Sequence, residues 1–391
     1  MTSRLYLDNA ATSFPKPPEV FEAMRRYAEE LGASAGRGAY REALASGELV
    51  ADCRRRLATL INAPATDHVV FTHNCSTALN QAIKGYLRKG DHVVTSRMEH
   101  NSVLRPLQAL SDEGLLEVTH APADCETGRV DAADLLAAIR PRTKLIVLAH
   151  ASNVTGTLQP IEAVGAEAQR RGIPFLVDAA QTAGHVLIDV QAMKIDLLAI
   201  PGHKGLLGPL GTGALYIRPG LEGAITPLVQ GGTGSVSERP VQPDFMPDKF
   251  ESGSHNAIGL AGLAAALQWI EDQSIESLAA HDRAVCARFL QKARELPGLV
   301  VYGPQHAEER VGVFSVRLSG LEPGELSALL ETEFGILTRS GLHCAPMAHE
   351  TIGTHTDGGT TRISFGAFNT PAHIDFCVEA LGKLSDVAVS R

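Results

Sequence analysis

Short apolar segments alternate with helical segments up to about residue 225, and this alternation constrains the fold more than any other feature. The strand-like segments are 68–72, 91–96, 115–121, 144–152, 174–180 and 196–202. Apolar residues recur at helical spacing in 17–31, 48–61, 76–87, 131–139 and 161–172. Strands that alternate with helices form right-handed crossovers and a mostly parallel sheet with helices on both faces. The sequence therefore predicts an α/β fold.

The chain of 391 residues is long for one core of typical size, and its texture changes after residue 226. Residues 227–256 are rich in Gly, Pro and Ser, and so long an irregular stretch is usually functional or lies at an interface. Two predicted helices follow, and about the last hundred residues are typical of a small α+β domain. We predict an arm near the active site at 1–16, a large domain over 17–256 and a small domain over 257–391.

Charge and hydropathy argue against several classes of partner. The net charge is −9 without any Lys/Arg run, which disfavours nucleic acid and anionic membranes. The first residues lack the apolar region of a secretory signal, and no run of apolar residues is long enough to span a bilayer. Six scattered cysteines without CxxC pairs favour a reducing cytoplasm, and none of the 15 histidines has the spacing of a zinc motif. The sequence predicts a cytoplasmic protein without a metal.

A lysine and an aspartate follow two of the predicted strands. Lys204 stands in a glycine-rich turn, and Asp178 ends the apolar part of the segment 174–180. A lysine in such a place is either an ion-pair partner or a reactive amine, and a lone aspartate is commonly a turn residue. Ligands of open α/β sheets bind beyond the carboxyl ends of the strands, where both residues converge. An amine for a Schiff base and a carboxylate for a pyridine nitrogen are what pyridoxal phosphate requires.

The same cofactor needs an anion site and contacts to its ring. Ser76 and Thr77 begin a predicted helix, where amide N–H groups and the helix dipole favour phosphate, although a serine there is also a common N-cap. His100 follows a strand and is a candidate to stack on the ring. Asn153 follows another strand and is either a turn former or a cofactor donor.

Seven motifs together resemble a known family in their order and spacing. They are LDNAATS, MEHNS, HASNVTGT, VDAAQ, GHKGLLGPLGTGALYI, FESGSHN and RSGLHCAP. Over residues 5 to 380 the chain resembles class V, fold-type I pyridoxal phosphate enzymes, and more narrowly the group II cysteine desulfurase and selenocysteine lyase family. The resemblance implies a homodimer in which a small C-terminal α+β domain brings Cys344 and Arg362 to a cofactor bound by the large domain.

The resemblance also implies a role for each cofactor-binding residue. Lys204 forms the Schiff base, and Asp178 pairs with the pyridine nitrogen. Gln181 hydrogen-bonds the phenolic oxygen, and His100 stacks on the ring and takes part in proton transfer. The remaining positions bind the phosphate: Ser76, Thr77, His203 and, from the second subunit, Ser254.

The substrate side of the site follows from the same resemblance. Arg362 clamps the substrate α-carboxylate, Arg339 lies close by, and Asn153 lies near the substrate. Cys344 acts as a nucleophile on the sulfur of L-cysteine, giving L-alanine and a persulfide on the enzyme for transfer to an acceptor protein. That step needs a thiolate, which the neighbouring Arg339 and His343 would favour as cations.

Some positions depart from the family pattern and leave the substrate open. Pro201 stands where relatives usually carry Ser or Thr, so one phosphate contact is lost, and Leu342 replaces a histidine beside the thiol. L-Selenocysteine is the close alternative substrate. Another class V C–S lyase or aminotransferase reaction is a more distant alternative. A non-catalytic cofactor-binding scaffold in sulfur relay is the alternative outside the enzymes.

Overall fold

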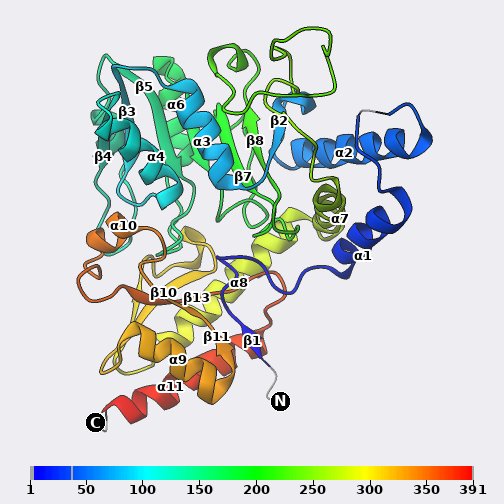
Figure 1. Ribbon diagram of the computed structural model, residues 1–391. Helices are drawn as coiled ribbons and strands as arrows, with labels where there is room; N and C mark the ends of the chain where they lie inside the picture. Colours follow the sequence, from blue (N-terminus) through cyan, green and yellow to red (C-terminus); the bar gives the residue numbers. More distant parts are fainter. Residues whose placement is uncertain (1–3, 37, 390–391) are drawn as a thin grey trace.

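The computed structural model describes residues 4–36 and 38–389, and its largest element is a seven-stranded sheet (Figure 1). The strand order is β2 (Val69–Thr72), β8 (Gly213–Ile217), β7 (Leu197–Pro201), β6 (Phe175–Asp178), β5 (Thr143–Ala149), β3 (Asp91–Ser96) and β4 (Leu116–Ala121). All neighbouring pairs are parallel except those of β8, which is antiparallel to both β2 and β7. The predicted mostly parallel sheet is confirmed.

Both faces of this sheet are buried because successive strand residues point to opposite sides. In β6, for example, Phe175 and Val177 pack in the core on one face and Leu176 packs in the core on the other. The helices α3 (Cys75–Tyr86) and α4 (Asn101–Asp112) cover the Leu176 face. The opposite face is covered by α2 (Arg41–Leu60), α5 (Ala132–Ala137), α6 (Ile161–Arg171) and α7 (Ala257–Gln273).

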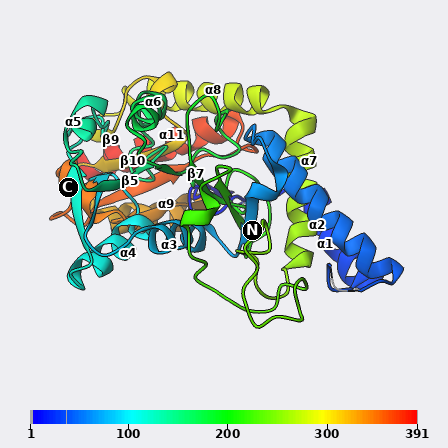
Figure 2. The same ribbon diagram turned by 90° about the horizontal axis from the view of Figure 1, so that it is seen from above.

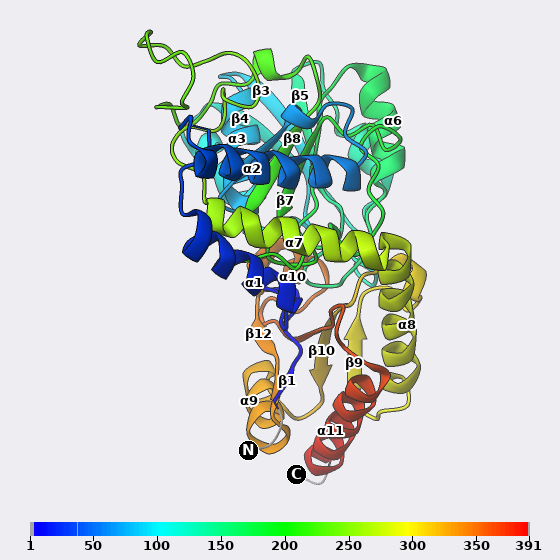
Figure 3. The ribbon, with the colours of Figure 1, turned by 90° about the vertical axis from the view of Figure 1, so that its right-hand side faces the viewer.

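The C-terminal part contains a smaller antiparallel sheet below the large one (Figure 3). Its order is β12 (Arg339–Gly341), β13 (Thr360–Ser364), β10 (Val313–Leu318) and β9 (Leu299–Tyr302). A second apolar core packs against this small sheet and contains side chains of α8 (Ile275–Ala293), α9 (Pro323–Phe334) and α11 (Pro371–Val389). The short helix α10 (Pro346–Thr351) lies between β12 and β13 in the sequence.

The N-terminal segment crosses from the small sheet to the large domain. Strand β1 (Leu5–Tyr6) pairs in parallel with β11 (Ile336–Leu337), and α1 (Pro18–Arg26) then packs on α7. The segment 336–341 forms β11 and β12, which belong to two different sheets. The remaining short turns are a π-helical turn at Tyr27–Leu31 and 3₁₀ turns at Thr66–His68, Glu222–Ala224 and Ala307–Glu309.

The position of α7 bears on the proposed domain boundary at residue 256. Leu260, Leu263 and Leu267 of α7 belong to the core of the large sheet, together with residues of α2. The irregular segment 227–256 loops away from the large sheet (Figure 2). A boundary after α7 would therefore keep that core whole, and we propose it in place of residue 256 as the division between folding units.

A buried ion pair anchors this irregular segment to the large domain. Arg54 of α2 binds Glu251 through two hydrogen bonds of 2.6 and 2.8 Å, and Glu251 also accepts from the Phe71 amide and from His255. Burial alone would raise the pKa of Glu251, but the hydrogen bonds from Arg54 and His255 lower it to about 2. The pair thus fixes the chain that carries Ser254.

Removing Arg54 should therefore destabilise the fold. We expect Arg54→Met to lower the free energy of unfolding by about 3–5 kcal/mol, because it leaves the Glu251 carboxylate buried without its main partner. The matched control is Arg26→Met, which breaks an exposed pair with Glu30 and should cost about 0.5 kcal/mol or less. Thermal and urea unfolding measure both variants. Equal losses in the two would contradict a stabilising role for the buried pair.

Two further observations concern the whole described chain. Across 4–36 and 38–389, no helix is long and apolar enough to cross a membrane. All six cysteines are free thiols, four of them buried and two, Cys125 and Cys344, exposed.

Candidate active site

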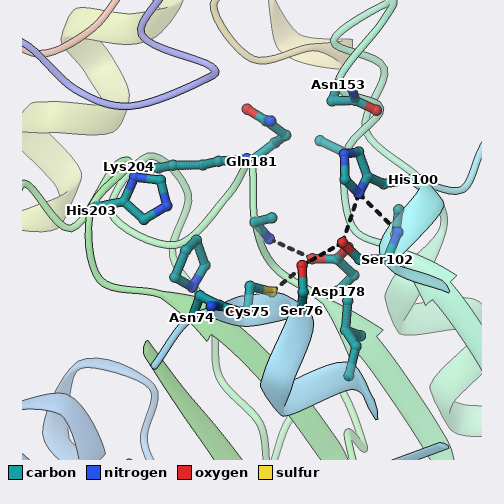
Figure 4. A pocket seen from close by; sticks show the side chains of 15 residues that line it. Asn74, Cys75, Ser76, His100, Ser102, Asn153, Asp178, Gln181, His203 and Lys204 are labelled. Atoms are coloured by element: carbon teal, nitrogen blue, oxygen red, sulfur yellow. Dashed lines mark hydrogen bonds between the residues drawn. The ribbon is translucent and has the colours of Figure 1, made fainter. Parts of the chain in front are cut away.

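Four of the predicted site residues lie just beyond the carboxyl ends of parallel strands. Lys204 follows β7, Asp178 ends β6, Asn153 follows β5, and His100 follows β3. They line one cavity of about 100 Å³, together with Ser76, Gln181 and His203. In Figure 4, Lys204 and His203 lie on one side of this cavity and His100 and Asn153 on the other.

Lys204 offers an amine that no neighbour occupies. Among the described residues, Nζ has no hydrogen-bond or ion-pair partner, although its side chain lines the cavity. Burial lowers the pKa of Lys204, the Asp178 carboxylate opposes this shift, and Arg362 and Arg339 add to it. When the pKa of a lysine is lowered, a larger fraction of its amine is neutral at neutral pH, and only the neutral amine acts as a nucleophile or base.

Asp178 is held by one oxygen only. Its Oδ1 accepts from the Ala180 amide at 2.9 Å and from the Cys75 thiol at 3.4 Å, and no described group hydrogen-bonds to Oδ2. Burial raises the pKa of Asp178, while the Ala180 amide and Lys204 oppose that rise. The second oxygen is thus left for a cationic or N–H partner in the cavity. The contact of Cys75 was not predictable from the sequence, because its motif indicated only a phosphate site at the start of a helix.

His100 has a defined tautomer because it is the N-cap of α4. Its Nδ1 accepts the Ser102 amide N–H at 3.0 Å, so the ring proton is on Nε2. Ser102 Oγ is also 2.9 Å from Nδ1 and 2.6 Å from Ser76 Oγ. Burial, followed by the charges of Lys204 and Arg339, lowers the pKa of His100 to about 4. His100 is therefore a neutral N–H donor at physiological pH.

Ser102 is a site residue that the sequence reasoning missed. The spacing His-x-Ser at the start of a predicted helix could have identified it. The side chain of an N-cap residue accepts from the amide two residues later, which brings it next to the hydroxyl of a serine at that position.

The predicted phosphate residues divide between two pockets. Ser76 and His203 line the cavity with Lys204, and Ser76 lies in the first turn of α3, whose leading amides favour an anion. Thr77 and Ser254 instead line the neighbouring pocket, and the amide and hydroxyl of Thr77 both donate to Asn74, the N-cap of α3. Burial, with the nearby Lys204 and Lys16, lowers the pKa of His203 to about 4.

The loop that carries Cys344, between β12 and α10, is hydrogen-bonded directly to the large domain. Asn153 Nδ2 donates to the His343 carbonyl at 2.6 Å, and the Asn101 amide donates to the Cys344 carbonyl at 2.7 Å. The backbone φ angles of His343 and Cys344 are positive, 49° and 59°. This left-handed conformation costs energy in residues other than glycine. These two bonds hold the exposed Cys344 at the side of the cavity occupied by His100 and Asn153.

The surroundings of Cys344 correct one expectation from the sequence. Arg339 Nη2 is 3.6 Å from Sγ, so the predicted contact between this guanidinium and the thiol is present. His343 is only 3% exposed, and burial, with the charge of Arg362, lowers its pKa well below the usual value. Its Nε2 bonds to Thr360 Oγ1 at 3.1 Å. His343 is therefore neutral and does not assist the thiol as a cation, because strand β13 buries it.

Arg362 is buried next to Asn153 and Arg339. It is 1% exposed, donates to Asp8 Oδ1 at 2.7 Å and to the Asn153 carbonyl at 3.3 Å, and is paired with Arg339 across β12 and β13. Burial lowers its pKa, and the Asp8 carboxylate opposes that shift. Cys344, Arg339 and Arg362 do not line the Lys204 cavity itself, but Asn153 touches both this group and the cavity.

Comparison with known proteins agrees with this arrangement. The family model for aminotransferase class-V matches residues 5–376. A probable cysteine desulfurase from Methanothermobacter thermautotrophicus is 36% identical over 389 residues, covering 98% of this chain and 96% of that one.

Two solved structures are also similar. The apo structure of a cysteine desulfurase from Thermococcus onnurineus has a TM-score of 0.91 and 32% identity, covering 98% of this chain and 95% of that one. A cysteine desulfurase from Escherichia coli has a TM-score of 0.86 and 29% identity, covering 99% and 95%. The fold expected from the sequence, that of fold-type I pyridoxal phosphate enzymes, is confirmed. Proteins of this family generally depend on pyridoxal phosphate. The chain belongs to the class-V aminotransferase family.

Proposed function

We propose that this protein is a pyridoxal phosphate-dependent cysteine desulfurase, which converts L-cysteine to L-alanine and leaves a persulfide on Cys344. One observation carries the proposal. The loop that presents Cys344 is hydrogen-bonded by Asn153 to the rim of the cavity in which Lys204 and Asp178 converge. The similar proteins that are named cysteine desulfurase or probable cysteine desulfurase support the same activity.

The residues of the cavity fit pyridoxal phosphate. Lys204 offers an unpartnered amine and Asp178 an unoccupied carboxylate oxygen, so they would hold the aldehyde carbon and the pyridine nitrogen. Ser76, His203 and the first amides of α3 would hold the phosphate, and the partner subunit's Ser254 would complete this site in a homodimer. Thr77 would contribute least, because Asn74 already accepts from its amide and its hydroxyl. Gln181, His100 and Asn153 would contact the ring and its oxygen. When bound, the cofactor supplies an electron sink for the carbanion at the substrate Cα.

The chain's own groups would then handle the substrate and its protons. Arg362, assisted by Arg339, binds the α-carboxylate, because a guanidinium can donate two parallel hydrogen bonds to it. The lowered pKa of Lys204 suits its amine to accept the Cα proton. The Nε2–H of His100 is oriented to donate, because the helix cap occupies Nδ1.

Sulfur transfer occurs at Cys344. The thiolate of Cys344, beside Arg339, attacks the sulfur of the substrate, so that an S–S bond forms and the Cβ–S bond breaks. The electron pair of the broken bond stays with the substrate carbon, which takes up protons to become L-alanine. L-Cysteine and one enzyme thiol thus give L-alanine and one enzyme persulfide, without an external oxidant. A sulfur-acceptor protein would then remove the outer sulfur.

The test is incubation of the purified holoenzyme with L-cysteine and, separately, with L-selenocysteine. We expect L-alanine in equal amount to the sulfur released, and a mass increase of one sulfur atom on the peptide that contains Cys344. L-Alanine from L-selenocysteine alone would favour a selenocysteine lyase. No L-alanine from either substrate would overturn the proposal in favour of another class V reaction or a non-catalytic sulfur-relay scaffold.

A further inference from the structure

The motif LDNAATS has contacts that the assigned roles leave unexplained. Its residues connect the small sheet to the large domain: Asn9 bonds to the Ser364 carbonyl, Ala10 accepts from Gln181, and Thr12 bonds to His203. Within this segment, only Asp8 carries a charge, and its side chain faces Arg362. We ask what a carboxylate does beside the residue proposed to bind the substrate carboxylate.

Asp8 is the only carboxylate paired with Arg362 among the described residues. The distance from Asp8 Oδ1 to Arg362 Nη2 is 2.7 Å, and the arginine side chain is 2% exposed. Tyr6 Oη donates to the Asp8 carbonyl at 3.0 Å, and Asp8 forms a parallel bridge with Ser364, so the backbone of Asp8 is fixed to β13. The pair therefore joins the N-terminal arm to the strand that carries Arg362.

Charge explains why this pair is needed. Arg339 lies opposite Arg362 in the register of β12 and β13, so two guanidinium groups share one part of the site. Burying a guanidinium without a counter-charge costs free energy, so such a side chain would rotate toward solvent or admit water. Asp8 offsets one of the two positive charges and leaves a net positive site for an anion.

Geometry explains why the pair does not block the substrate. Asp8 takes one N–H of Nη2 and the Asn153 carbonyl takes one of Nη1, while Nε is buried without a partner. One N–H on each terminal nitrogen is left over, and a carboxylate needs two guanidinium N–H groups to bind in bidentate fashion. Asp8 thereby determines the orientation of the arginine toward its ligand.

We propose that Asp8 is a positioning residue that holds Arg362 ready for the α-carboxylate of the substrate and so sets the preference for free amino acids over analogues without that carboxylate. The inference rests on the proposed function for the identity of the substrate. It requires no direct contact between Asp8 and the substrate.

The experiment compares ligands with and without the carboxylate in Asp8→Ala and Asp8→Asn holoenzymes. We expect Asp8→Ala to raise KM for L-cysteine about ten- to a hundredfold, with kcat changed less than about threefold, because a charge-assisted interaction with the carboxylate is weakened. For L-cysteine methyl ester, KM should change less than about threefold. Asp8→Asn keeps an oxygen acceptor without the charge and should lie between wild type and Asp8→Ala.

A binding measurement separates this inference from the proposed function. Calorimetry with L-alanine and L-alaninamide requires no turnover, and only the affinity for L-alanine should fall in the Asp8 variants. The matched control is Asp357→Asn, which breaks an exposed pair with Arg317 of the same sheet and should leave both affinities unchanged. Equal losses for both ligands, or no loss for L-alanine, would overturn the role of Asp8. Failure of the wild type to produce L-alanine would instead overturn the proposed reaction.

Discussion

Replacement of Lys204 by alanine is expected to reduce L-alanine formation from L-cysteine by at least about a thousandfold, since one group is lost that serves both as covalent anchor and as base. The amine has no partner in the described structure, and its pKa is lowered by burial. No neighbouring lysine can replace it, because the other lysine near this turn, Lys16, is bound to Ser13 and to the His203 carbonyl. Discontinuous assay of L-alanine measures the loss.

A second readout identifies the anchor directly. Borohydride reduction of the wild-type holoenzyme should leave a stable cofactor adduct on the peptide that contains Lys204, and the visible absorbance should disappear. The adduct should be absent in Lys204→Ala and retained in Lys144→Ala, in which an exposed lysine of β5 is removed. Activity of Lys204→Ala within about tenfold of wild type would refute the assignment of the base, given the usual contribution of such a group.

Replacement of Cys344 by alanine is expected to lower the turnover of L-cysteine by at least about a hundredfold, because sulfur then has no nucleophile to which it can transfer. Cys344 is the exposed thiol beside Arg339, at 3.6 Å from its Nη2, and the loop is held by two hydrogen bonds to the large domain. Turnover of L-selenocysteine should fall much less, since selenium leaves carbon more readily. Mass spectrometry should find no additional sulfur on this variant.

The other exposed cysteine provides the control for this prediction. Cys125 lies in the turn between β4 and α5, so Cys125→Ala should retain full activity and the persulfide on Cys344. Cys344→Ser keeps the shape of the side chain without the thiol and should resemble Cys344→Ala. Equal desulfuration by wild type and Cys344→Ala would exclude the persulfide role and leave a lyase reaction in which sulfide departs directly.

The candidate site was partly predictable because it is built on strand ends. Strand periodicity is local, and it identified β3, β5, β6 and β7 well enough to bring His100, Asn153, Asp178 and Lys204 to one edge of the sheet. Their roles came from the family resemblance. The charge state of His343 was not predictable, since it depends on burial by β13, a strand that follows it in the chain.

The contacts of one side chain, Thr77, and of one helix, α7, could not be predicted from the sequence either. In the sequence, Thr77 and Ser76 were equal candidates for the phosphate, but Asn74 occupies the amide and the hydroxyl of Thr77. The sequence predicted a helix after residue 256 and assigned it to the small domain, but the leucines of α7 pack on the large sheet. Both outcomes depend on which partners lie within reach after folding.

The sequence by itself determined the α/β class, the strand ends at which chemistry is placed, and the residue types that suit pyridoxal phosphate. The fold class and the strand ends follow from periodicities of two and 3.6 residues, which act over short stretches of chain. The residue types can be read at each position without any structure. The tertiary structure alone decided that Asn153 binds His343 in the loop of Cys344, 190 residues away, and that Asp8 holds Arg362, 354 residues away. Such pairs form only when two sheets and an N-terminal arm pack together, because the hydrogen bonds act over about 3 Å and depend on no local pattern.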